Sequence, residues 1–138
     1  MRIAIDAMGG DHAPDVIIKG SLDALDLLDE GDQIVLVGDR AVIEEHIRER
    51  GISDSRLTIH HAPDQIAMDE SPVDAVRSKP NSSIVQLMQL GSKRHSDNPV
   101  DVVISAGNTG ACVSAATMYM RRLPGVHRPG IATAIPTF

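Results

Sequence analysis

Two glycine-rich turns contain residues that could bind an anion. The first, DAMGGDHAP, spans residues 6–14, and the second, SAGNTGA, spans residues 105–111. Each follows a short run of Ile and Val and leads into a helical pattern. Glycine lets the backbone approach a ligand, and the first N–H groups of a helix favour an anion. Because Ser105, Asn108 and Thr109 add neutral hydrogen-bond donors, the second turn would suit phosphate or a carbonyl oxygen.

Neither turn is a nucleotide-binding motif. The first lacks the third glycine of G-x-G-x-x-G, and no G-x-x-x-x-G-K-[ST] occurs in the chain. Asp6 and Asp11 place negative charge near the first turn, which argues against a second bare phosphate there. These acids favour holding a cation, a hydroxyl or the loop itself. A structural alternative stays open, in which both segments are tight turns and Asp6, Ser105 or Asn108 only caps a loop or helix.

Other polar residues have a functional and a structural interpretation. His12 is a candidate through its position, although a histidine on a surface loop is the commoner case. Lys79 in KPNSS would place a cation beside a helix start, or it is an exposed lysine next to a helix cap. Asp69 and Glu70 are interpreted as solvated loop acids, with lining of the cleft as the alternative. Cys112 is interpreted as a packing residue rather than a nucleophile.

Composition excludes several classes of protein. The 138 residues are 42% hydrophobic with one Phe and one Tyr, so an aliphatic core is expected and there is no aromatic platform for bases. A net charge of −6 without a basic stripe argues against nucleic-acid binding. The single cysteine excludes an internal disulfide and a cysteine-based zinc site. His60 and His61 point to opposite faces of a strand, so no metal shared by them is expected. No apolar run resembles a signal peptide or membrane span, which predicts a cytoplasmic protein.

Strand-like and helical segments alternate along the chain. Strands are predicted over residues 2–6, 33–39, 56–62 and 100–107, with a fifth beginning near Ile131. Helices are predicted over 14–30, 40–50, from 81 or 82 to about 91, and over 108–122. This order predicts an α/β fold, a Rossmann-like three-layer α/β/α sandwich with a mainly parallel sheet. Residues 63–80 interrupt the alternation and are predicted to form an inserted loop with a short helix at 71–78.

Five segments together carry a family resemblance: IAIDAMGGDHAP, VLVGD, MDESPVDAVRSKPNSS, VISAGNTGA and LPGVHRPGIATAIPT. In this order they resemble the PlsX family of phosphate acyltransferases, also called acyl-ACP:phosphate transacylases. Family members are much longer, so residues 1–138 match the amino-terminal part of a single acyltransferase domain and lack its carboxyl-terminal portion. Pro80 and Asn81 stand where a basic residue and an acid are commoner in the family.

The resemblance implies transfer of a fatty acyl group from acyl carrier protein to inorganic phosphate, which yields acyl phosphate for phospholipid synthesis. It also implies a fold related to phosphotransacetylases and isocitrate-type dehydrogenases, and a homodimer. Peripheral association with the membrane is implied as well, with a glycerol-3-phosphate acyltransferase as the downstream membrane partner. No cofactor is implied.

Phosphate is already an anionic nucleophile, so such an enzyme must hold it against the thioester carbonyl and stabilise the oxyanion. His12 is expected to protonate the leaving thiolate, and Asn108 and Thr109 to act in catalysis. Binding of phosphate or the oxyanion is expected at Ser105, Gly107, Asn108, Thr109 and Gly110. Gly9, Gly10, Asp11 and His12 would form the facing wall of the cleft, and Lys79 and Ser82 would be further phosphate contacts.

Two other functions stay open from the sequence. An isocitrate- or isopropylmalate-type dehydrogenase would share the gross fold. It should show clustered arginines for a carboxylate substrate and aspartates for a divalent metal, and this chain shows neither convincingly. The other alternative is an incomplete chain or binding module without activity of its own.

Overall fold

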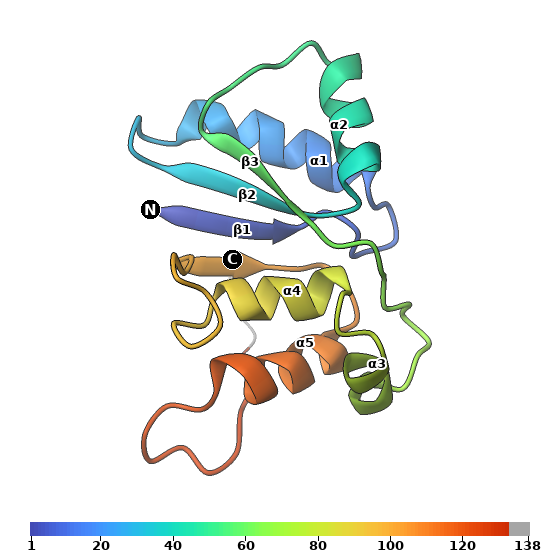
Figure 1. Ribbon diagram of the computed structural model, residues 1–138, viewed down its shortest axis with the longest axis vertical. Helices are drawn as coiled ribbons and strands as arrows, with labels where there is room; N and C mark the ends of the chain where they lie inside the picture. Colours follow the sequence, from blue (N-terminus) through green and yellow to red (C-terminus); the bar gives the residue numbers. More distant parts are fainter. Residues whose placement is uncertain (133–138) are drawn as a thin grey trace, which may run out of the picture.

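The sheet consists of four parallel strands in the order β3-β2-β1-β4 in a computed structural model that describes residues 1–132 (Figure 1). The strands are β1 (Arg2–Asp6), β2 (Gln33–Gly38), β3 (Leu57–His61) and β4 (Val102–Ile104). Ile5 of β1 pairs with Leu36 of β2 on one side and with Ile104 of β4 on the other. Because all four strands run the same way, their carboxyl ends meet at one edge of the sheet.

Helices connect the strands. They are α1 (Asp15–Asp23), α2 (Arg40–Glu49), α3 (Pro72–Ser78), α4 (Ser83–Leu90) and α5 (Thr109–Ala115). A 3₁₀ turn over Ala24–Leu27 extends α1, and a π-helical turn over Ala116–Met120 extends α5.

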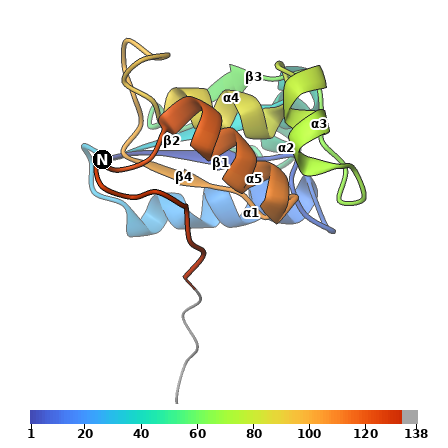
Figure 2. The same ribbon diagram turned by 90° about the horizontal axis from the view of Figure 1, so that it is seen from below.

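Each face of the sheet has its own hydrophobic core. On one face, Ile18 and Leu22 of α1 and Ile43 of α2 pack on Ile34 and Leu36 of β2. On the other face, α3, α4 and α5 pack on small and β-branched side chains of the sheet. These are Ala4, Val35, Val37 and the half-buried Val103. Figure 2 shows α1 and α4 on opposite sides of the sheet. The α/β Rossmann-like sandwich predicted from the sequence is thus confirmed, and every strand of the described part is parallel.

Three predicted elements were too long. The pattern over 14–30 yields α1 and its 3₁₀ turn, which end where Leu28 adopts an extended backbone (φ −97°, ψ 147°). The strand predicted over 100–107 is regular only at Val102–Ile104, because Ser105 and Gly107 belong to a hydrogen-bonded turn. The helix predicted over 108–122 ends at Met120.

The carboxyl-terminal strand is not seen. Ile131 and Ala132, where it should begin, have no regular secondary structure, and residues 133–138 lie outside the described residues. Within residues 1–132, none of the helices has the length and apolar character needed to cross a bilayer.

Candidate functional site

The two glycine-rich turns contact each other at the carboxyl edge of the sheet. One joins β1 to α1 and the other joins β4 to α5, on neighbouring strands. A Cβ atom built on buried Gly9 would lie 2.8 Å from the backbone nitrogen of Gly107, and closer still to Oδ2 of Asp6. One built on Gly107 would lie 3.3 Å from Cα of Gly9. The contact therefore requires glycine at Gly9, and it places the predicted anion turn directly against its predicted facing wall.

Asp6 lies beneath this contact and joins the two turns. It is fully buried at the end of β1. Its Oδ1 accepts a hydrogen bond from the N–H of Met8 (3.1 Å), and its Oδ2 accepts one from the hydroxyl of Ser105 (2.8 Å). From the sequence, Asp6 could cap a loop or hold a cation, a hydroxyl or the loop itself. In the structure it caps the loop at Met8 and holds the hydroxyl of Ser105.

The Ser105 hydroxyl has limited capacity for a ligand. Its single proton is donated to Asp6, while its oxygen accepts from the N–H of Gly107 (3.1 Å). A serine hydroxyl has one proton to donate. In this arrangement Ser105 therefore shapes the turn, and donation to phosphate would require that proton to leave Asp6.

Asn108 joins the second turn to the inserted loop. The side chain is 6% exposed, and its Oδ1 accepts from the N–H of Ala111 (3.0 Å), which caps α5. Its amide nitrogen lies 3.2–3.3 Å from three carbonyl oxygens of the loop, those of Ala67, Met68 and Glu70. Helix capping was the structural alternative for Asn108, whereas its contact with the loop had no signal in the sequence.

Lys79 and Glu70 form an ion pair inside the same loop. Nζ of Lys79 lies 2.6 Å from Oε1 of Glu70 and 3.0 Å from the carbonyl oxygen of Gln65. The side-chain amide of Gln65 in turn donates to the carbonyl of Met8 (2.6 Å), which ties the loop to the first turn. The hydrogen bond from Lys79 lowers the pKa of the Glu70 carboxyl, and the backbone N–H of Ala67 contributes in the same direction. Glu70, interpreted as a solvated loop acid, is thus half-buried and paired, and the charge of Lys79 is already partnered.

Two predicted contact residues have packing roles in the structure. Ser82 is fully buried and accepts from the N–H of Val85 (3.5 Å) as the N-cap of α4. Gly110 lies against α3, because a Cβ there would come 2.6 Å from Cγ of Pro72. Neither observation assigns a ligand to these residues.

Several backbone N–H groups of the two turns have no protein partner at this contact. The N–H groups of Gly9, Gly10, Thr109 and Gly110 make no hydrogen bond to another residue in the part of the chain that the structure describes. Gly10 has φ of +113°, which turns the backbone in a direction that other residues rarely adopt. The side chains of Thr109, Asp11 and His12 are exposed beside these donors. The arrangement can therefore accept an anion or a carbonyl oxygen.

Cys112 lies one turn of helix behind Asn108. The side chain is half-buried and packs against the core on the α5 side of the sheet. Burial raises the pKa of its thiol, the charge of Asp6 adds to this shift, and the neighbouring Ser105 hydroxyl opposes it. A thiol held in its neutral form is a poor nucleophile.

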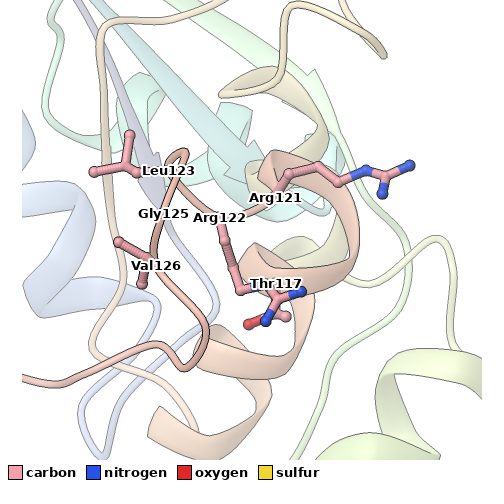
Figure 3. Close-up of a pocket in the computed structure, with 6 residues that line it drawn as sticks. All are labelled: Thr117, Arg121, Arg122, Leu123, Gly125 and Val126. Carbon is pink, nitrogen blue, oxygen red and sulfur yellow. The ribbon is translucent and has the colours of Figure 1, made fainter.

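No group of three or more His, Cys, Asp or Glu side chains within residues 1–132 is arranged to hold a metal ion. A surface hollow of about 380 Å³ lies elsewhere, at the carboxyl end of the α5 helical run (Figure 3). Six residues line it, and the guanidinium of Arg121 extends away from Leu123 and Val126: Thr117, Arg121, Arg122, Leu123, Gly125 and Val126. None of the residues that line the hollow belongs to either glycine-rich turn, so the hollow is distinct from the contact between the turns.

Comparison with known proteins decides the family. A family model described as "Fatty acid synthesis protein" matches residues 1–138. The chain belongs to this family. Relatives named "Phosphate acyltransferase" include those of Dictyoglomus turgidum and Bacillus subtilis, each 42% identical over 137 residues, and that of Thermoanaerobacter pseudethanolicus, which is 44% identical. In each case the match covers 99% of this chain and 39% of the relative, so the family member described here spans about two fifths of its relatives' length.

Proposed function

We propose that the contacting turns form part of a phosphate acyltransferase active site, which transfers a fatty acyl group from acyl carrier protein to inorganic phosphate. Family membership supports acyl transfer and favours it over the dehydrogenase alternative. The observation that carries the proposal is the group of unpaired N–H donors contributed by both turns at one edge of the sheet. Homodimer formation and docking at a membrane beside a glycerol-3-phosphate acyltransferase stay predictions.

The reaction makes few demands on side chains. An oxygen of hydrogen phosphate attacks the thioester carbonyl, the C–S bond breaks, and the phosphate proton ends on the leaving thiolate. Atoms and charge therefore balance without a cofactor. The site must bring the phosphate to the carbonyl and stabilise the oxyanion, and preorganised N–H groups can do both. We assign the movement of this proton to His12, because its imidazole is exposed in the first turn and histidine is the commonest general acid.

Within the second turn, Thr109 is the side chain best suited to contact phosphate. It is exposed at the first position of α5, whereas the polar groups of Ser105 and Asn108 already bind protein atoms. We propose that the Thr109 hydroxyl and the neighbouring N–H groups bind phosphate. Asn108 would act through the loop that it holds.

Phosphate titration of the ¹⁵N-labelled chain tests this proposal. Inorganic phosphate should shift the amide signals of Gly9, Thr109 and Gly110, and Thr109→Ala should raise the Kd about 10-fold, because a hydrogen bond to a charged group contributes about 1.5–3 kcal/mol. Thr117→Ala is the matched control, since that hydroxyl donates to the carbonyl of Val113 at the far end of the same helical run. Equal phosphate affinity in the two variants would contradict the assignment of Thr109.

Catalysis can be tested in a chimera. The 137 aligned residues of this chain would replace their counterpart in the Bacillus subtilis phosphate acyltransferase, and acyl phosphate formation from acyl carrier protein would be measured with and without Thr109→Ala. The variant should raise the KM for phosphate and leave the KM for the acyl carrier substrate unchanged. An inactive chimera with a native melting curve would argue against the proposed function.

A further inference from the structure

Asp6 is a buried carboxylate that contacts no cation within the described residues. Burying a carboxylate is costly unless hydrogen bonds satisfy it, and both of its oxygens are satisfied here. The two donors are the N–H of Met8 from the first turn and the hydroxyl of Ser105 from the second. Every hydrogen bond that the structure assigns to this carboxylate therefore serves one of the two turns.

The hydrogen bonds form one continuous chain between the turns. The N–H of Met8 and the hydroxyl of Ser105 both donate to Asp6, and the N–H of Gly107 donates to the oxygen of Ser105. Asp6 and Ser105 are 99 residues apart in sequence. Since Asp6 is the last residue of β1, which pairs with both β2 and β4, its backbone is held by the centre of the sheet.

These hydrogen bonds lie where the two turns touch. Oδ2 of Asp6 is the atom nearest to a Cβ built on Gly9, and the next two are backbone atoms of Gly107. A shift of either turn would change the separation of the N–H groups that the two turns present. In an enzyme site, a misplacement of about 1 Å can cost about 100-fold in rate.

We infer that Asp6 is a positioning residue: its two hydrogen bonds set the separation of the turns and so preorganise the donors of the anion site. The effect of Asp6 on the separation of the turns does not depend on a ligand, whereas its effect on phosphate affinity rests on the proposed function. Asp6 lies under the turns and acts on the ligand only through Met8, Ser105 and Gly107. Its hydrogen-bonding geometry, rather than its charge, performs this role.

Two substitutions separate geometry from charge. Asp6→Ala removes both acceptors, whereas Asp6→Asn keeps an oxygen for Met8 and an amide that can donate to Ser105, without the charge. Asp39→Ala is the matched control. Asp39 also follows a strand, and its carboxylate accepts from the N–H groups of Ala41 and Val42, which belong to neither turn.

Amide hydrogen exchange measures the turns without a ligand. Asp6→Ala should speed exchange at Gly107 by about 10-fold, the effect of losing one well-formed hydrogen bond, and Asp6→Asn should stay within about threefold of the parent. Asp39→Ala should leave Gly107 unchanged. If Asp6→Ala does not fold, Ser105→Ala replaces it, with faster exchange expected at Gly107 and continued protection at Met8.

Phosphate titration of the same proteins gives the functional result. The Kd for inorganic phosphate should rise about 10-fold in Asp6→Ala and stay within about threefold in Asp6→Asn. Unchanged amide exchange at Gly107 and unchanged phosphate affinity in Asp6→Ala would overturn the inference. Equal losses of protection and affinity in Asp6→Ala and Asp6→Asn would also overturn it, because they would show that the charge itself is required. If the parent chain binds no phosphate, the proposed function fails, and the exchange rates at Gly107 still decide the role of Asp6.

Discussion

Replacing Gly9 with alanine tests the contact between the turns most directly. Gly9 is buried, and an added methyl group would meet Asp6 Oδ2, the Gly107 nitrogen at 2.8 Å and the Gly107 Cα at 3.0 Å. Two of these atoms are backbone, and the third belongs to a carboxylate held by two hydrogen bonds. None is the free end of a flexible side chain, so the turns themselves must move apart.

The expected loss of stability follows from two opposing terms. Overpacking a tight site costs about 1–3 kcal/mol, and the rigid neighbours place Gly9→Ala in the upper part of this range. The lower entropy of the unfolded alanine chain offsets about 0.4–1 kcal/mol. A net loss of about 1–2 kcal/mol results, and for a chain of this size it should lower the Tm by roughly 4–10 °C.

Thermal unfolding followed by circular dichroism measures this loss, with Gly20→Ala as the matched control. Gly20 lies exposed inside α1 with nothing within 4 Å of a built Cβ, so the same substitution there should stabilise the helix by about 0.5–1 kcal/mol. Opposite signs for the two variants are therefore expected. A Tm for Gly9→Ala equal to or above that of the parent would refute the close contact of the turns.

Two further predictions concern titration and reactivity. Because Lys79 lowers the folded-state pKa of Glu70, this ion pair should stabilise the protein above the unfolded pKa of the carboxyl and lose its effect as the pH falls through the folded pKa. Lys79→Met should raise the pKa of the Glu70 carboxyl, followed by NMR, and weaken the pH dependence of the free energy of unfolding in acid. An unchanged pKa would contradict the ion pair. Since burial raises the pKa of Cys112, iodoacetamide at pH 8 should alkylate the folded chain more slowly than the urea-unfolded chain, and equal rates would contradict its burial.

The sequence predicted the order and type of the elements well, because periodicity reports which face of a segment is buried. Ile17 to Leu28 indicated one helix, but the pattern could not show that Ala24–Leu27 would tighten into a 3₁₀ turn. Similarly, VDVVISAG reads as one apolar run, while in the structure Ser105 leaves the strand to donate to Asp6. Element ends depend on hydrogen bonds to distant residues, and such partners leave no periodic signal.

Site residues were harder to interpret for the same reason. The two turns could be located from their glycines and their place between strand and helix, and the parallel sheet brought them together as expected. Individual roles could not be predicted, because a polar side chain serves a ligand only if the protein has not already satisfied it. Asn108 faces three loop carbonyls and Lys79 faces Glu70, and neither partner is close in sequence.

The sequence by itself determined the α/β class, the two glycine-rich turns and the family, since these depend on local pattern and on motifs that survive without coordinates. Only the tertiary structure decided that the turns touch, that Gly9 must be glycine, and that Asp6 lies beneath both. Hydrogen bonding explains the difference. Whether Ser105, Asn108 or Thr109 keeps a free polar group depends on partners up to 99 residues away, which the fold alone brings within reach.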